Sequence, residues 1–304
     1  SLAQEGAIAV VFFGDGAAQA GVFHESLNLA ALWKAPVLFV CENNGYAEFS
    51  ARQEHTPVAN VADHTTAYGV AAVTADGSDV PAVIGAAREL IAAVRGGGGP
   101  ALLELAVTRL RPHYEGGAAP RPDTDGADPL ATLARRLEDE GTPANSLGDI
   151  RGAAVAEMEG ALESALAAPE PDPRDDSRIV FARAPADGRA AAVAASGDGT
   201  MIAAARNALA AVMEVDEEVM ILGEDVAAGG PFGLTRDLAD AHGSERVRNT
   251  PISEGAVMGV AVGLALAGRK PLVDLMFDDF LTLASDQLFN HAAKIHFMSG
   301  GTRS

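Results

Sequence analysis

Two short polar motifs, each at the end of an apolar run, are the residues of this chain best suited to chemistry. Gly14-Asp15-Gly16 follows one run and Asn43-Asn44 follows the next, with twenty-six residues between the two motifs. Carboxylate and carboxamide oxygens are hard ligands, which suit a magnesium ion that also binds phosphate oxygens. Either motif alone would be read as a turn. The chemistry therefore depends on whether the fold brings them together.

The elements around these motifs form a β-α-β pattern. Residues 7–13 are a continuous apolar run, typical of a strand buried on both faces of a parallel sheet. Residues 17–34 have helical length and spacing, and residues 36–41 form a second apolar run. Parallel strands joined in this way commonly lie side by side, so their carboxyl ends meet at one edge. Asp15 and Asn44 are expected to converge there, beside helix N-terminal amides that favour phosphate.

The stretch GDGAAQAGVFHESLNLAALWKAPVLFVCENNGYA resembles the α-type subunit of the decarboxylating component of 2-oxo acid dehydrogenase complexes. Its Gly-Asp-Gly and Asn-Asn spacing is similar to the thiamine diphosphate motif. The resemblance implies three ligands for Mg²⁺, which are Asp15, the Asn44 side chain and the main-chain oxygen of Tyr46. It also implies contacts with the cofactor's diphosphate by Gly14, Gly16 and Ala17.

His113 lies in RLRPHYEG, where the family usually has a glycine before the histidine. The resemblance implies that His113 lines the catalytic site near the diphosphate and the substrate. Pro112 stands at the glycine position here and stiffens the loop. The alternative interpretation of His113 is an exposed loop histidine. His24 and His55 are interpreted as ordinary surface or packing residues.

Residues 223–294, which include GEDVAAGG, NTPISEGA and LMFDDF, resemble the β-type subunit of the same family. The resemblance implies that Glu254 is the catalytic proton-relay residue, hydrogen-bonded to a ring nitrogen of the cofactor's aminopyrimidine so that the reactive thiazolium carbon can lose its proton. It also implies cofactor contacts by Met276 and by Phe280, whose ring would pack on the pyrimidine. Taken alone, Glu254 would be a first-turn helix acid capped by Ser253, and Phe280 a core aromatic.

The predicted fold class is α/β, with two thiamine diphosphate-binding-fold domains whose parallel sheets are flanked by helices. The boundaries are residues 1–168 for the α-type diphosphate and magnesium domain with a helical tail, 169–198 for a linker, and 199–304 for the β-type, transketolase-like pyrimidine domain. In the first half we expect further strands at 70–74 and 101–107 and helices at 80–95, 129–140 and 150–168. In the second half we expect helices at 201–213, 255–267 and 281–298 and strands at 219–222 and 271–277. By the resemblance both domains are incomplete, and the isolated chain is expected to be inactive.

Composition narrows the choice of partners. Forty-two acidic against twenty-two basic residues give a formal charge of −20, which disfavours nucleic acid and anionic membrane surfaces. The single cysteine, Cys41, cannot form an internal disulfide, which fits a reducing compartment. No apolar run approaches the roughly 18 to 20 residues of a membrane span. A cytoplasmic location is expected.

The resemblance implies oxidative decarboxylation of a 2-oxo acid, with pyruvate as the leading substrate, and transfer of the acyl group to the lipoyl group of an acyltransferase component. The expected cofactors are thiamine diphosphate and Mg²⁺, and a homo-oligomer is expected. An acetoin or branched-chain 2-oxo acid dehydrogenase is the close alternative. A transketolase or deoxyxylulose-phosphate synthase is a more distant one, and a non-catalytic cofactor-binding module is the non-enzymatic alternative.

Overall fold

The structure is a computed structural model that describes residues 6–114, 116, 128–170, 172, 174, 180 and 199–302. The chain divides into two compact units, Ser1–Glu170 and Pro171–Ser304, and each is considered by itself. The predicted linker, residues 169–198, falls for the most part outside the described residues. In the described part of the chain, no helix is both long enough and apolar enough to cross a membrane.

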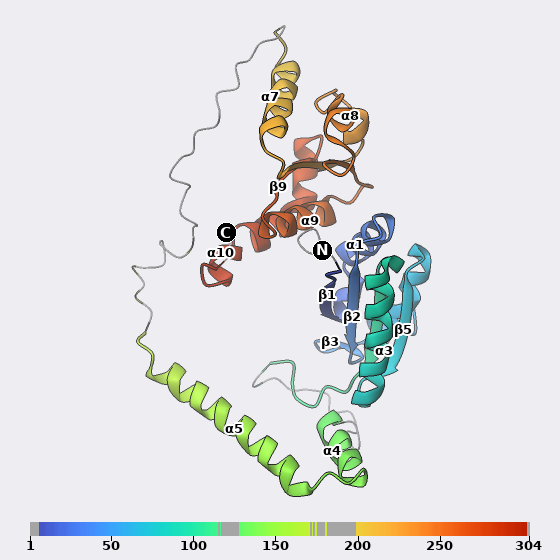
Figure 1. Cartoon of the computed structure of the whole chain (residues 1–304), viewed down its shortest axis with the longest axis vertical. Helices are drawn as coiled ribbons and strands as arrows, with labels where there is room; N and C mark the ends of the chain where they lie inside the picture. The colour runs from blue at the N-terminus through green and yellow to red at the C-terminus, as the bar shows by residue number, and fades with distance from the viewer. Residues whose placement is uncertain are drawn as a thin grey trace. The chain divides into compact units, whose positions relative to one another are not determined.

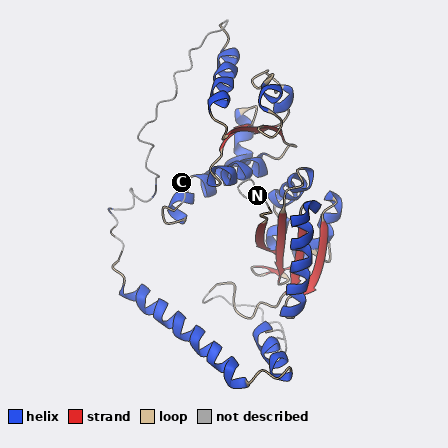
Figure 2. Cartoon of the chain, in the orientation of Figure 1, coloured by secondary structure: helices blue, strands red, loops and turns tan. Residues whose placement is uncertain are grey.

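A four-stranded parallel sheet with the order β1-β2-β6-β5 forms the centre of unit 1 (Figures 1 and 2). Its strands are β1 (Ala9–Gly14), β2 (Val37–Asn43), β5 (Ala71–Asp76) and β6 (Ala101–Ala106). All three pairings are parallel, and the register places Gly14 beside Glu42 and Asn43 beside Ala106. The carboxyl ends of β1, β2 and β6 therefore lie along one edge. The predicted strands of this half are confirmed within one to two residues. The expected burial of the first strand on both faces is wrong, because β1 lies at the edge of the sheet and its side chains are mostly exposed.

The side chains of β2 alternate between two cores, as the pleat of a strand requires. Phe39 and Cys41 pack with residues of α1 (Gly21–Leu32) and with Val61 of η2 (Val61–Tyr68). Leu38 and Val40 pack on the opposite face with residues of α3 (Val80–Ala93), which crosses the sheet in Figure 1. A π-helical turn, η3 (Val94–Gly98), ends α3. The central strand is buried on both faces, so its apolar run is continuous.

The helix predicted for residues 17–34 begins later than expected. A 3-10 turn, η1 (Asp15–Gln19), follows β1 directly, and α1 starts at Gly21. Ala20 between them has extended backbone angles, with φ −73° and ψ 139°, which separates the two elements. The first amides of α1 therefore lie several residues beyond Ala17.

Two small elements that the sequence did not predict follow β2. A hairpin of β3 (Tyr46–Ala47) and β4 (Ser50–Ala51) leads into the short helix α2 (Arg52–His55). Both β3 and α2 pack against η1.

After β6, unit 1 ends in α4 (Pro129–Asp139) and α5 (Ala144–Ala167). The second of these starts six residues before the predicted helix at Ile150 and has no buried residue.

Unit 2 has a three-stranded parallel sheet with the order β8-β7-β9. Its strands are β7 (Val219–Gly223), β8 (Val247–Asn249) and β9 (Lys270–Asp274). Its helices include α7 (Met201–Val215), the short α8 (Leu238–His242) and α9 (Glu254–Leu266). One core joins Met213 of α7, Ile221 of β7 and Leu238 of α8. On another side, α9 packs against β9 and β7. The sequence did not predict β8 or α8, and a short 3-10 turn, η5 (Val226–Ala228), follows β7.

Two predicted elements of unit 2 are shorter than expected. The strand predicted to run to Phe277 ends at Asp274, because the Asp274 carboxylate accepts a 2.9 Å hydrogen bond from the Met276 N–H and Met276 adopts a left-handed φ of 66°. The helix predicted for 281–298 is divided into η6 (Asp278–Ala284), a π-helical segment η7 (Gln287–Ala292) and α10 (Ile295–Met298). An i to i−5 bond from the Ala293 N–H to the Leu288 carbonyl, 2.9 Å, marks the change in winding.

Candidate cofactor-binding site

Asp15 is the first residue after β1 and is only 1% exposed. Its Oδ1 accepts a 3.3 Å hydrogen bond from the main-chain N–H of Asn44, whereas its Oδ2 is buried without a partner. Burial raises the pKa of Asp15; hydrogen bonds from the main-chain N–H groups of Asn44 and Asp15 and the charge of His55 act in the opposite direction. A buried acceptor without a partner is uncommon, and here it fits a site for a cation.

The Asn-Asn-Gly-Tyr segment after β2 folds into a tight turn held by its own side chains. The Asn44 Oδ1 accepts a 3.1 Å hydrogen bond from the Tyr46 N–H, and the Asn43 Oδ1 accepts a 3.0 Å bond from the Gly45 N–H. Gly45 has a φ of 78°, which glycine adopts without strain. The turn therefore fixes the Asn44 carboxamide close to Asp15, and the amide oxygen keeps a second lone pair.

Gly16 lies where η1 and the β3 strand approach most closely. A Cβ added to Gly16 would lie 2.8 Å from the Cβ of Ala47 and 3.1 Å from its Cα. Ala17 follows in the same 3-10 turn, where its carbonyl accepts a 3.1 Å bond from the Ala20 N–H. Only glycine lets the backbone of η1 pack this closely on the strand that begins with Tyr46.

Glu104 of β6 supports this edge, and the sequence reasoning did not identify it. Its side chain is 1% exposed and accepts three hydrogen bonds, from the Asn43 Nδ2 at 2.6 Å and from the N–H groups of Val61 and Ala62 at 3.1 and 2.8 Å. It thereby ties the end of β2 to the start of η2. A carboxylate inside the buried run ALLELA was the available sequence signal, because such a group requires partners.

The loop that carries His113 runs over the β3–β4 hairpin. The Arg109 Nη2 donates a 2.8 Å hydrogen bond to the Glu48 carbonyl, its guanidinium lies 5.6 Å from the centre of the Tyr46 ring, and the Tyr114 ring meets Phe49 at 6.2 Å. His113 itself is exposed, and no hydrogen bond, ion pair or ring contact of the described residues links it to Asp15, Asn44 or Tyr46. The structure thus brings Asp15 and Asn44 together, and none of the described interactions connects His113 with them.

Asp15 supplies the carboxylate among the oxygen atoms of unit 1 that are expected to bind a metal ion. In the described part of the chain no group of three or more His, Cys, Asp and Glu side chains could hold a metal. The set around Asp15 consists instead of the free Asp15 Oδ2, the Asn44 carboxamide and main-chain oxygens, which suits a hard cation that takes its other ligands from phosphate and water. The residues present fit a magnesium-bound diphosphate.

In unit 2, Glu254 is the first residue of α9 and is half-buried. Ser253 occupies the N-cap position, but its hydroxyl donates to the Ile252 carbonyl at 2.6 Å and makes no side-chain cap. The interpretation of Ser253 as a side-chain cap is therefore wrong, although its carbonyl accepts the first helical bond from the Val257 N–H at 2.8 Å. The first amides of α9, beside Glu254, therefore make no hydrogen bond with the Ser253 side chain.

A second acid, Glu224, lies within electrostatic reach of Glu254. Glu224 follows the central strand β7, and its pKa is raised by burial first, then by the charges of Glu254 and Asp225. The preceding Gly223 allows close packing, since an added Cβ would lie 2.6 Å from the Asp274 carbonyl. The sequence reasoning did not single out Glu224, although GED follows a buried strand as GDG does in unit 1.

Met276 lies in the turn after β9, and Phe280 lies in η6, the 3-10 helix that follows this turn. Met276 lines a cavity of about 420 Å³ together with Asp274, Phe232 and residues of α7. The Phe280 ring meets the Phe277 ring edge-on at 5.5 Å, and Phe277 meets Phe232 at 5.6 Å. The left-handed φ of Met276 is uncommon for a residue other than glycine. The turn therefore holds an aromatic group next to an apolar cavity.

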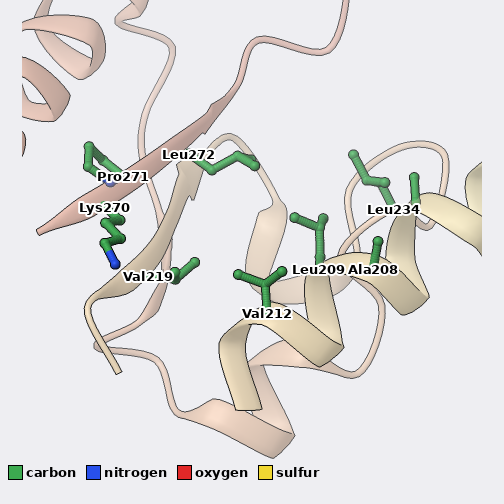
Figure 3. A pocket seen from close by; sticks show the side chains of 9 residues that line it. Ala208, Leu209, Val212, Val219, Leu234, Lys270, Pro271 and Leu272 are labelled. Atoms are coloured by element: carbon green, nitrogen blue, oxygen red, sulfur yellow. The ribbon is translucent and has the colours of Figure 1, made fainter. Parts of the chain in front are cut away.

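A larger cavity, about 580 Å³, lies between α7 and the strands of unit 2. Leu209 and Val212 of α7 lie across from Val219 and Leu272 (Figure 3). Its lining is apolar apart from Lys270, and none of the predicted site residues belongs to it. We interpret it as a packing groove.

Comparison with known families assigns both units. The model of the dehydrogenase E1 component matches residues 2–174, more than half of the chain. The chain belongs to this family. The pyrimidine-binding domain of transketolase matches residues 199–303, so this dehydrogenase E1 chain joins an E1 segment to a transketolase-type segment. The resemblance to α-type and β-type subunits and the α/β fold class with parallel sheets are confirmed.

The relatives of the dehydrogenase E1 segment and of the second segment differ. The first segment is 42% identical over 179 residues to the alpha subunit of acetoin:2,6-dichlorophenolindophenol oxidoreductase from Cupriavidus necator, covering 56% of this chain and 54% of that protein. It is 31% identical over 186 residues to the pyruvate dehydrogenase E1 alpha subunit of Porphyra purpurea, covering 58% and 53%. The second segment is 45% identical over 102 residues to the mitochondrial 2-oxoisovalerate dehydrogenase beta subunit of Chaetomium thermophilum, covering 33% and 22%. The dehydrogenase E1 chain thus spans about half the length of its alpha-type relatives.

Proposed function

We propose that this chain carries residues for both ends of thiamine diphosphate in an oxidoreductase that decarboxylates a 2-oxo acid. The observation that carries the proposal is the buried, unpartnered Oδ2 of Asp15 next to the Asn44 turn. In the proposal, Asp15, Asn44 and the Tyr46 main-chain oxygen hold Mg²⁺, and Gly14, Gly16 and Ala17 border the diphosphate. The bound cofactor would supply a carbon nucleophile that stabilises the electrons released by decarboxylation.

Residues of unit 2 would act on the aminopyrimidine end of a bound cofactor. Glu254, half-buried at the start of α9, would accept and return a proton at the aminopyrimidine ring. Met276, held in the turn after β9, and Phe280 of η6 would border that ring. His113 would act on the substrate from its loop. The acyl product would pass to the lipoyl group of an acyltransferase component, in a cytoplasmic complex of several copies.

Acetoin is the second candidate substrate, with one observation in its favour. The first segment is 42% identical to an alpha subunit named for acetoin and 31% identical to one named for pyruvate. The second segment is 45% identical to beta subunits named for 2-oxoisovalerate and for 3-methyl-2-oxobutanoate. Pyruvate, acetoin and 3-methyl-2-oxobutanoate therefore form the test set.

Binding and turnover can be separated by experiment. Thiamine diphosphate is titrated into the protein with and without Mg²⁺ by calorimetry, and the loaded protein is then given each of the three substrates with an artificial electron acceptor. Magnesium-dependent binding with turnover of one substrate supports the proposal and names the substrate. Binding without turnover of any substrate agrees with the inactivity expected of the isolated chain, and absence of binding overturns the proposed function.

A further inference from the structure

His55, a half-buried residue of unit 1, has two unsatisfied polar atoms. Both of its ring nitrogens, Nδ1 and Nε2, are buried, and neither has a hydrogen-bond partner. No other histidine in the described part of the chain shows this at both nitrogens. His24, in contrast, places its Nδ1 3.2 Å from the Tyr68 hydroxyl. Leaving a buried donor or acceptor unpaired costs about 1 to 3 kcal/mol, so an unpaired ring calls for an explanation.

The position of His55 is fixed by the same turn that carries the proposed metal ligands. His55 ends α2, which begins where the Arg52 N–H donates a 2.8 Å hydrogen bond to the Gly45 carbonyl. At its other end, the Thr56 N–H donates a 3.0 Å bond to the Arg52 carbonyl. Helix α2 packs against η1, the turn that contains Asp15 and Gly16. The imidazole is therefore held beside the edge where β1 and β2 end.

The unpartnered atoms of unit 1 concentrate at this place. Of the five buried side-chain atoms without a partner in the described residues, three belong to Asp15 and His55. Helix α2, which ends at His55, packs against η1, which begins at Asp15, and the charge of His55 lowers the pKa of the Asp15 carboxyl. Neither side chain satisfies the other. Both side chains therefore have buried polar atoms without a partner in the same part of unit 1.

The chemistry of the two groups indicates what would satisfy them. Asp15 offers an acceptor, which attracts a cation, and the imidazole always carries at least one N–H donor, which attracts an anion. Mg²⁺ takes oxygen ligands, so the imidazole is poorly suited to be one of its ligands. A metal-bound phosphate presents a cation to Asp15 and anionic oxygens to a neighbouring donor. A metal-bound phosphate would therefore satisfy the Asp15 acceptor and the His55 donor together.

We propose that His55 is a further residue of the metal–diphosphate site, where it donates a ring N–H to a phosphate oxygen and positions the diphosphate against Asp15. This inference rests on the proposed function, because it assigns a residue to the same site. It differs from the interpretation of His55 as an ordinary surface or packing residue.

The test compares three variants of the 304-residue chain. His55→Leu removes both nitrogens at similar volume, His55→Gln keeps an N–H donor, and His24→Leu is a control at a histidine of the same unit that already has a partner. Binding of inorganic diphosphate with Mg²⁺, and of thiamine diphosphate with Mg²⁺, is measured by calorimetry, and ³¹P NMR reports the environment of the bound phosphorus. Circular dichroism checks that each variant is folded.

We expect His55→Leu to weaken binding of both ligands by about 10- to 100-fold and to shift the bound ³¹P resonances, as for a lost hydrogen bond to a charged group. His55→Gln should bind within about threefold of the parent, and His24→Leu should bind as the parent does. Unchanged affinity in a folded His55→Leu, or an equal loss in His55→Gln, would overturn the role of His55 alone. A parent chain that binds neither ligand would overturn the proposed function and this inference together.

Discussion

The Oδ1 of Asp15 accepts a hydrogen bond from the main-chain N–H of Asn44, with 3.3 Å between the two atoms. This bond joins the residue after β1 to the residue after β2, which are 29 positions apart in the chain. It occupies one oxygen of the carboxylate and leaves Oδ2 buried and unpartnered. The arrangement orients an acceptor toward a ligand that the protein itself does not supply.

Asp15→Ala should weaken magnesium-dependent binding of thiamine diphosphate more than Asn44→Ala does. Loss of an outer partner of a metal ligand typically costs 10- to 100-fold in affinity, so loss of a charged ligand should cost about 100-fold or more. Calorimetric titration of both variants measures the difference. Asp76→Ala, which removes an exposed carboxylate at the end of β5, is the matched control. Parent-like affinity in Asp15→Ala would remove Asp15 from the site.

Gly16→Ala should destabilise unit 1 and displace the hairpin that carries Tyr46. The new Cβ would lie 2.8 Å from the Ala47 Cβ, so one of the two backbones must shift. Overpacking of this kind costs about 1 to 3 kcal/mol in the free energy of unfolding. Urea unfolding followed by circular dichroism measures this cost. Gly21→Ala is the control, because the nearest atom to its added Cβ is 3.9 Å away; an equal loss in both variants would contradict the steric explanation.

Glu104→Leu should destabilise unit 1 by about 2 to 4 kcal/mol, since it leaves three buried donors without an acceptor. Glu104→Gln should cost less, because it keeps one oxygen that can accept. Both are compared by urea unfolding with Glu89→Gln, an exposed residue of α3. If Glu104→Leu is as stable as the parent, the carboxylate does not tie β2 to η2.

Glu254→Gln should leave the fold intact and slow proton exchange at the reactive carbon of bound thiamine diphosphate by about 100-fold or more. The change is nearly isosteric at a helix start that has no side-chain cap, so cofactor affinity should change less than the exchange rate. Deuterium exchange followed by ¹H NMR after acid quench measures the rate. Exchange as fast as in the parent would exclude the proton-relay role.

Glu224→Gln should stabilise unit 2 near neutral pH. Burial, with the charges of Glu254 and Asp225, raises the pKa of Glu224 in the folded state, so the ionised form opposes folding. The contribution of this group to stability is fully present below its unfolded pKa and is lost as pH rises through the raised folded value. Thermal unfolding should therefore show parent and variant alike in acid and the variant higher at pH 7. A difference independent of pH would point to packing instead.

The apolar runs in the sequence predicted β1, β2, β5, β6 and β7 within one to two residues. Burial on both faces explains the runs of β2, β6 and β7, whereas β1 and β5 are edge strands whose side chains are mostly exposed. The sequence pattern failed at elements whose geometry depends on distant partners. The start of α1 depends on a 3-10 turn packed on β3, and the end of β9 on a left-handed Met276. The hairpin, β8 and α8 are too short for a periodic pattern to show.

The sequence by itself determined that Asp15 and Asn44 meet, since two parallel strands joined by one helix bring their carboxyl ends to a common edge. Only the tertiary structure decided which other groups surround them. Glu104 reaches Asn43 across 61 positions and Ala62 across 42, and His55 reaches the Asp15 neighbourhood through a hairpin with no periodic signature. Local patterns report burial and secondary structure, which depend on neighbours in the chain. Whether a buried polar atom has a partner depends on which remote segments the topology packs beside it.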